Sequence, residues 1–155
     1  MNARFFNSYG PGEVPGRYRN VIPNFFYWAI KGLPLPITGD GTETRDWTYV
    51  GDIVNGLISM GIREEAVGEA FNLGSGIEHR VIDMAKIVNK LTENDAGIVF
   101  RARRDWDVKT RLLSCTTKAE NNLGYHPATS FEEGLKKVHQ WFVANWDNIN
   151  KSSEF

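Results

Sequence analysis

The sequence predicts an α/β chain whose strand content is so small that, in isolation, it is α+β-like. Segments that alternate like strands are interspersed with segments of helical periodicity along most of the chain. The expected strands are few and short, so the sequence does not encode a complete doubly wound sheet. The length of 155 residues fits one domain of ordinary size. We therefore expect a single domain over residues 3–148 and a loose tail over residues 149–155.

The composition excludes several classes of protein. Lys and Arg number 18 against 19 Asp and Glu, so we expect neither a nucleic-acid nor a membrane partner. No apolar run is long enough for a transmembrane helix, and residues 1–4 do not resemble a secretion signal, which makes a cytoplasmic location the default expectation. Cys115 is the single cysteine, and the three histidines lack partners at ligand spacing, so no metal site is expected.

The first third of the chain predicts a strand, a helix and an extended segment. Residues 3–7 read as a strand with no element before it, so we expect another element to precede it in the intact protein. A helix is expected over residues 20–31, with Pro23 tolerated in its first turn and Gly32 as its stop. The prolines of residues 33–37 restrict that segment to a sheet edge or a wall.

The middle of the chain predicts two strands and two helices. Residues 45–50 alternate like a strand, and Asp52 is expected to cap a helix that runs to about Ile62. A short strand follows over residues 70–73. Apolar residues at helical spacing then predict a helix over residues 82–91.

The last third predicts one strand and two helices. Residues 98–100 read as a strand, and residues 117–123 as a helix that ends at Gly124. Ser130 and Glu133 form a capping-box pattern, which opens a final helix over residues 131–146.

Two groups of basic residues are candidates for an anion site. Arg45 follows a glycine turn, and its planar guanidinium suits a diphosphate, although a surface ion pair with Asp46 would explain it equally well. Arg101, Arg103 and Arg104 form the second group, for which a solvated strand end is the alternative. Two separate arginine sites in one small acidic domain suit an anionic ligand.

Four segments in series resemble the extended short-chain dehydrogenases that act on nucleotide sugars, the NAD-dependent epimerase/dehydratase family. Residues 4–12 read RFFNSYGPG and resemble the family's R-x-x-N-x-Y-G-P segment. Residues 32–41 (GLPLPITGDG) and 45–52 (RDWTYVGD) resemble its G-x-P-L-x-I-x-G-x-G and R-D-[FW]-x-[YH]-V-x-D block. Residues 70–76 (AFNLGSG) resemble its F-N-[LIV]-G-[ST]-G turn. Its R-x-G-D, K-A and L-G-[WY]-x-P ending resembles residues 104–107, 118–119 and 123–127.

The resemblance implies a fold, a cofactor and roles for individual residues. The fold would be the substrate-binding region of such an enzyme, with a few strands left over from an incomplete Rossmann sheet, and the full-length family uses NAD. The implied substrate-binding residues are Asn7 for the substrate, Asn20 and Val21 for the nucleotide, Pro36 and Thr38 for the base, Arg45 and Arg104 for the diphosphate, and Asp107 for the ribose. Phe5 and Phe6 would border the nicotinamide.

The chain also departs from the family pattern. Asp105 and Trp106 stand where the family has a variable residue and a glycine, so the chain departs from the pattern between Arg104 and Asp107. The glycine-rich cofactor loop is absent, since the turn at residues 74–76 has the wrong spacing. The catalytic Tyr-x-x-x-Lys of the family is also missing, and we interpret Tyr27 and Lys31, which share that spacing, as a coincidence.

These features together predict a binding role without catalysis. We expect the chain to bind the nucleoside-diphosphate part of a nucleotide sugar for an epimerase, dehydratase or decarboxylase, to lack catalytic residues and tightly bound NAD, and to be inactive alone. The alternative is a standalone binding or protein-interaction module derived from that family. The strands at residues 4–7 and 70–73 would leave an exposed edge and an uncovered apolar face, so self-association or pairing with the missing Rossmann half is expected.

Overall fold

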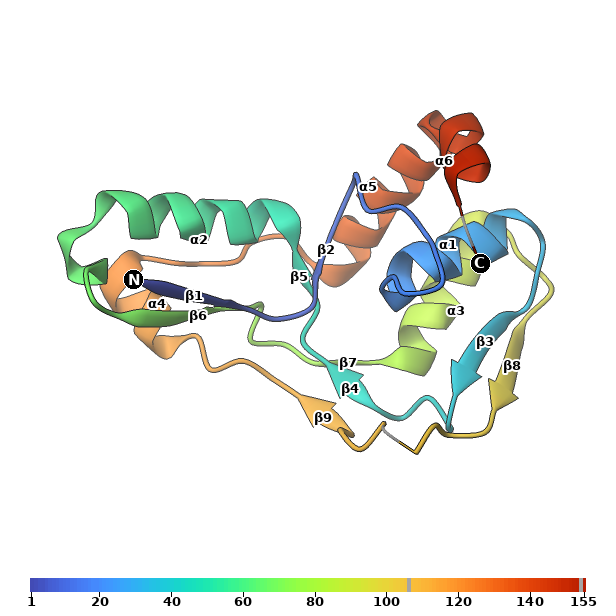
Figure 1. Ribbon diagram of the computed structural model, residues 1–155, viewed down its shortest axis with the longest axis horizontal. Helices are drawn as coiled ribbons and strands as arrows, with labels where there is room; N and C mark the ends of the chain where they lie inside the picture. Colours follow the sequence, from blue (N-terminus) through green and yellow to red (C-terminus); the bar gives the residue numbers. More distant parts are fainter. Residues whose placement is uncertain (106, 154) are drawn as a thin grey trace.

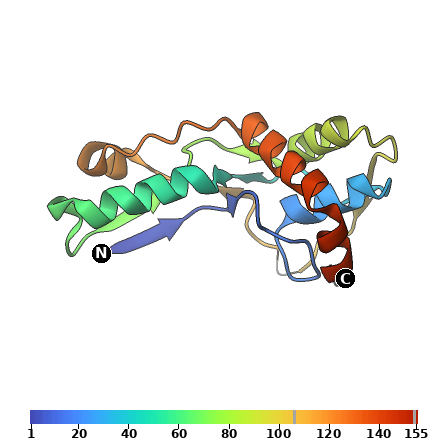
Figure 2. The same ribbon diagram turned by 90° about the horizontal axis from the view of Figure 1, so that it is seen from above.

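The computed structural model describes residues 1–105, 107–153 and 155. The chain is elongated, with one hydrophobic cluster at each end and short strands between them (Figures 1 and 2). This arrangement agrees with the mixed α/β class and the short strands that the sequence predicts.

A two-stranded parallel sheet forms the end that holds the N-terminus. Strand β1 (Asn2–Phe5) pairs with β6 (Ala70–Leu73), with Phe5 opposite Leu73. The strand alternation turns Phe71 and Leu73 to one face, where both are buried. Three helices share the hydrophobic cluster at this end with the sheet: α2 (Val50–Ile62), the short 3₁₀ helix η1 (Glu64–Ala66) and α4 (Thr117–Leu123).

Helices dominate the opposite end. A second parallel pair joins β3 (Leu35–Thr38) to β8 (Ile98–Arg101) beside them. Phe26 of the first helix is fully buried and lies 5.7 Å, between ring centroids, from Phe142. The helices of this end are α1 (Val21–Ile30), α3 (Val81–Thr92), α5 (Phe131–Ala144) and α6 (Trp146–Ser152).

Short ladders occupy the centre of the molecule (Figure 1). Strand β2 (Ser8–Tyr9) pairs in parallel with β5 (Thr48–Tyr49). Strand β4 (Thr44–Arg45) pairs antiparallel with β7 (His79–Arg80) and parallel with β9 (Arg111–Leu112). The centre therefore brings together segments from the first, second and last thirds of the chain.

Most of the expected helices are confirmed. Pro23 is the third residue of α1, inside its first turn. Gly124 ends α4 in the left-handed conformation, with φ of 61°. Ser130 Oγ accepts a hydrogen bond from Glu133 N at 3.3 Å, as a capping box requires, while the Glu133 carboxylate pairs with Lys137.

Three expectations about the elements are wrong. The strand expected over residues 45–50 is broken into β4 and β5, because the intervening Asp46 turns its carboxylate into the interior. Asp52 does not cap α2, since Tyr49 occupies that position; Asp52 instead accepts hydrogen bonds from the backbone N–H groups of Ala128 and Thr129, both at 3.2 Å. The final helix ends at Ala144 instead of residue 146.

The tail expected to be loose from residue 149 is instead helical as far as Ser152. Ile149 is buried in the large cluster, which explains why α6 docks. The Phe155 ring stacks on Tyr27 with 5.0 Å between ring centroids. None of the described helices is long and apolar enough to cross a lipid bilayer.

Candidate functional site

A cavity of about 210 Å³ lies between the central ladders and the helical end. It brings together all the residues for which the sequence predicts a substrate contact: Asn7, Asn20, Val21, Pro36, Thr38, Arg45, Arg104 and Asp107. These residues come from the start of β2, the start of α1, β3, β4 and the segment after β8. Phe5 and Phe6 do not line the cavity, and Phe5 is 53% exposed at the end of β1.

One wall of the cavity is apolar. Ile22 and Phe25 reach it from α1, Ile37 from β3, and Trp47 from the segment between β4 and β5. All four side chains are buried in the large hydrophobic cluster. This wall can cover the flat face of a ring, since such sites are mostly apolar with a few placed polar groups.

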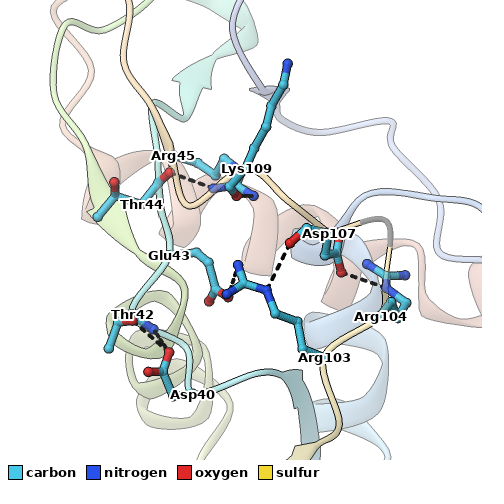
Figure 3. A network of polar contacts seen from close by, with 9 residues as sticks. All are labelled: Asp40, Thr42, Glu43, Thr44, Arg45, Arg103, Arg104, Asp107 and Lys109. Atoms are coloured by element: carbon cyan, nitrogen blue, oxygen red, sulfur yellow. Dashed lines mark hydrogen bonds and ion pairs between the residues drawn. The ribbon is translucent and has the colours of Figure 1, made fainter.

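Arg45 is held in place by backbone carbonyl groups. Its Nη1 donates to the carbonyl oxygen of Thr44 at 2.8 Å, and its Nη2 donates to that of Lys109 at 2.9 Å (Figure 3). Arginine has further N–H donors, which these two bonds leave available to an anion. Both acceptors are backbone atoms, and no carboxylate among the described residues forms an ion pair with the Arg45 guanidinium.

Two of the three arginines in the second basic group lie beyond the strand that was expected to carry them. Strand β8 ends at Arg101, so Arg103 and Arg104 belong to the following loop and both line the cavity. Arg104 Nε forms an ion pair with Asp107 Oδ2 at 2.7 Å, and Arg103 Nε donates to the Asp107 carbonyl oxygen at 2.9 Å (Figure 3). Trp106, at the departure from the family pattern, lies outside the described residues.

Asp46 is a buried junction and not half of a surface pair with Arg45. Its Oδ1 accepts from Ser75 N at 2.9 Å, Ser75 Oγ at 2.6 Å and Thr48 Oγ1 at 3.1 Å. Its Oδ2 accepts from Gly76 N at 3.0 Å, Ser114 N at 3.2 Å and Ser114 Oγ. Burial acts to raise the pKa of Asp46, but the hydrogen bonds from Ser114 and Ser75 outweigh it and leave the pKa below its ordinary value.

The glycine turn at residues 74–76 therefore cradles a carboxylate of the chain itself. A Cβ at Gly74 would lie 2.2 Å from Ser114 Oγ, so only glycine fits beside this junction. The Asp46 carbonyl oxygen in turn accepts from Asn7 Nδ2 at 3.3 Å. Asn7 has a φ of 26°, an uncommon value that asparagine tolerates better than most residues. The junction thus supports both Arg45, its neighbour, and Asn7 on the cavity wall.

Comparison with known proteins identifies the family. The sequence model of the family described as GDP-mannose 4,6 dehydratase matches residues 1–138. The chain belongs to this family. Its relatives are NAD-dependent nucleotide-sugar epimerases, dehydratases and decarboxylases.

The family is represented by solved structures and curated sequences. An epimerase from Methanothermobacter thermautotrophicus is 68% identical, with a TM-score of 0.99 over 100% of this chain and 46% of the epimerase. The enzyme WbmF of Bordetella bronchiseptica, solved in complex with NAD+ and UDP, is 36% identical, with a TM-score of 0.83 over 96% of this chain and 47% of WbmF. A UDP-N-acetyl-alpha-D-glucosaminuronate decarboxylase of Bacillus cytotoxicus is 35% identical over 90% of this chain and 44% of its own.

The chain spans less than half the length of these relatives. Its fold is the corresponding part of an extended short-chain dehydrogenase, which confirms the expected fold class.

Tyr27 and Lys31 lie away from the cavity. Lys31 Nζ donates to Tyr27 Oη at 3.2 Å, and Tyr27 Oη donates to Asn150 Oδ1 of α6 at 3.2 Å. The pKa of Tyr27 is lowered, chiefly by a hydrogen bond with Ser153 and further by Lys31, against the effect of burial. Neither side chain lines the cavity. No group of three or more histidine, cysteine or acidic residues in the described part of the chain could hold a metal ion.

Proposed function

We propose that the cavity binds the nucleoside-diphosphate part of a nucleotide sugar, on behalf of an NAD-dependent epimerase, dehydratase or decarboxylase. The observation that carries this proposal is the meeting of Arg45 and Arg104, from separate segments, at one cavity with an apolar wall. Guanidinium groups offer paired donors to phosphate oxygens, and the apolar wall suits the base.

The remaining residues take roles along the same ligand. Pro36 and Thr38 of β3 would border the base, while Asn20 and Val21 would meet the nucleotide at the start of α1. Asp107 would accept from a ribose hydroxyl, and Asn7 would hydrogen-bond the substrate beyond the diphosphate. These residues reach one cavity from four separate segments of the chain, which supports one continuous ligand path.

The nicotinamide cofactor is not a group that this chain can hold by itself. Phe5 and Phe6 are the residues expected to border it, and Phe5 is largely exposed beside an open strand edge. The sequence has no glycine-rich cradle for a dinucleotide, and Tyr27 with Lys31 lies away from the cavity. We therefore propose that the chain positions the substrate, neither retains NAD tightly nor catalyses turnover by itself, and that hydride transfer to NAD requires the remainder of the enzyme.

An apolar stripe on α2 supports a protein partner at the other end. Val54, Ile58 and Ile62 recur every four residues and are 45%, 57% and 77% exposed, so they form one outward-facing row. The apolar face of β6 is covered by α2 and α4, contrary to the expectation of an uncovered sheet face. We propose that the α2 row and the open edge of β1 pack against a Rossmann-type half or a second copy of the chain.

Calorimetry tests the binding proposal. The chain is titrated with UDP, dTDP and GDP, and Arg45→Ala is compared with Arg80→Ala, which removes an exposed arginine that does not line the cavity. We expect saturable binding of at least one nucleotide, about tenfold weaker in Arg45→Ala and unchanged in Arg80→Ala. Absence of binding to all three nucleotides, or equal affinity in both variants, would refute the proposal.

Two further measurements test the proposed lack of turnover and the proposed protein partner. Incubation with NAD and a panel of UDP- and dTDP-sugars should give no product, and turnover by the chain alone would refute the positioning role. Light scattering at rising concentration should reveal association, and Ile58→Lys should reduce it. A strictly monomeric chain at high concentration would count against self-association through the α2 row.

A further inference from the structure

A carboxylate stands among the arginines of the cavity. Glu43 lies on the turn before β4, and its Oε1 forms an ion pair with Arg103 Nη2 at 3.0 Å (Figure 3). The Glu43 side chain is 11% exposed, whereas that of Arg103 is 43% exposed. Both residues line the cavity, yet neither belongs to the segments that resemble the family.

The turn at residue 39 makes room for this carboxylate. Gly39 has a φ of 80°, and a Cβ at this position would lie 3.0 Å from Glu43 Oε1. The carboxylate therefore occupies the space that the missing side chain leaves. The Glu43 carbonyl oxygen also accepts from Val81 N at 3.0 Å, which fixes the backbone at the start of α3. Glu43 is thus held in position from both its side chain and its main chain.

The charges around the cavity can be counted. Among the described residues that line it, four are cationic and two are anionic: Arg45, Arg103, Arg104 and Lys109 against Glu43 and Asp107. The excess is two positive charges. A nucleotide sugar carries one negative charge on each of its two phosphoryl groups, so the lining balances this ligand. Without Glu43 the excess would rise by one, and Arg103 would gain donors free for an anion.

Stability does not account for the pair. Although Glu43 is largely buried, Arg103 is 43% exposed, and water around the guanidinium screens the attraction, so the pair contributes little to folding. Its effect on a charged ligand is larger, since a guanidinium engaged by a carboxylate is a weaker donor to a phosphate beside it.

We propose that Glu43 is a specificity-determining residue of the cavity. By neutralising Arg103, it matches the site to the charge of a diphosphate diester and disfavours phosphates that carry an additional charge. This inference rests on the proposed function, because it takes the cavity to be the diphosphate site.

Two ligands that differ in charge at the diphosphate test the inference. At pH 8 the terminal phosphate of UDP is doubly ionised, whereas the same phosphate in UDP-glucose is esterified and carries a single negative charge. Calorimetry at pH 8 compares both ligands with the unmodified chain, Glu43→Gln and the double variant Glu43→Gln/Arg103→Gln. Glu69→Gln is the matched control. It removes the carboxylate of another ion pair, the one with Lys118, and Glu69 does not line the cavity.

We expect Glu43→Gln to bind UDP about tenfold tighter and UDP-glucose only about threefold tighter, with both gains reduced at high salt. The double variant should return to within about twofold of the unmodified chain, and Glu69→Gln should not differ from it. Two results would overturn the inference while leaving the proposed function in place. One is unchanged or weaker UDP binding by Glu43→Gln, and the other is UDP binding by the double variant that is much weaker than that of the unmodified chain. No binding of either ligand by the unmodified chain would overturn the proposed function and this inference with it.

Discussion

Replacing Asp46 with asparagine should destabilise the centre of the molecule by several kcal/mol. The carboxylate is fully buried and accepts from three donors on each oxygen, contributed by Thr48, Ser75, Gly76 and Ser114. Asparagine keeps the shape of the side chain but replaces one acceptor oxygen with an NH₂ group. That NH₂ group must then face three donors.

The magnitude follows from the donors that cannot adapt. Hydroxyl groups of Ser75, Thr48 and Ser114 can rotate and accept, but the backbone N–H groups of Ser75, Gly76 and Ser114 cannot. The less costly orientation places NH₂ at the Oδ1 position and leaves Ser75 N without an acceptor, which costs about 1–3 kcal/mol. Loss of charge weakens the remaining bonds, so the total is about 3 kcal/mol. For a chain of this size, the melting temperature should fall by about 10 °C.

Calorimetric melting of Asp46→Asn and a matched control tests this reasoning. Asp83→Asn removes the same charge from an exposed ion pair with Arg80 and should cost about 0.5 kcal/mol or less. Equal melting temperatures for the two variants would refute the junction role of Asp46.

Acid provides a second check on the same residue. Because the folded pKa of Asp46 is lowered, its contribution to the free energy of unfolding is present above the unfolded value of about 3.9 and is lost as the pH falls through the folded pKa. The difference in stability between the unmodified chain and Asp46→Asn should therefore shrink below about pH 4. A difference that stays constant on acidification would contradict this assignment.

Three further predictions concern packing and the cavity. Gly134→Ala should lower the free energy of unfolding by about 2 kcal/mol, because its Cβ would lie 2.0 Å from Tyr9 Oη. Gly61→Ala on α2 meets no atom within 4 Å and should stabilise by about 0.5 kcal/mol; a destabilised Gly61→Ala in the same urea titration would show that the packing is misassigned. Tyr27→Phe should leave UDP affinity within about twofold of the unmodified chain. The Tyr27 hydroxyl donates a hydrogen bond to Asn150 of α6, and Tyr27 does not line the cavity. A large loss of affinity would place Tyr27 in the site.

Local sequence patterns were sufficient for most of the helices. Helix α3 runs from Val81 to Thr92, one residue beyond each end of the segment that periodicity predicts. Gly124 and Ser130 mark helix ends through backbone chemistry that depends only on near neighbours. These signals are local, so the helix ends can be predicted without knowledge of the tertiary structure.

Long-range contacts decided what the sequence did not predict. Asp46 interrupts the expected strand because its carboxylate turns inward to accept hydrogen bonds from Ser75 and Ser114. These partners are distant in the sequence, so the local pattern around Asp46 does not reveal them. The tail forms α6 because Ile149 is buried against helices from elsewhere in the chain. Neither effect leaves a periodic pattern around the residue concerned.

The candidate site shows the same division. The resemblance to the family grouped Asn7, Arg45 and Arg104, whereas composition and spacing did not single out Asn7 and left both arginines with a structural alternative. The pairing of Glu43 with Arg103 was missed because it joins two loops, and neither residue belongs to a motif. A glycine followed four residues later by a glutamate, as at Gly39, is too common to indicate such a pair.

A crystal structure of the chain with UDP tests the central claim most directly. We expect the diphosphate to lie within hydrogen-bonding distance of the guanidinium groups of Arg45 and Arg104, with the base against Pro36 and Thr38 of β3. UDP bound elsewhere, or bound in the cavity without contact to either arginine, would contradict the account.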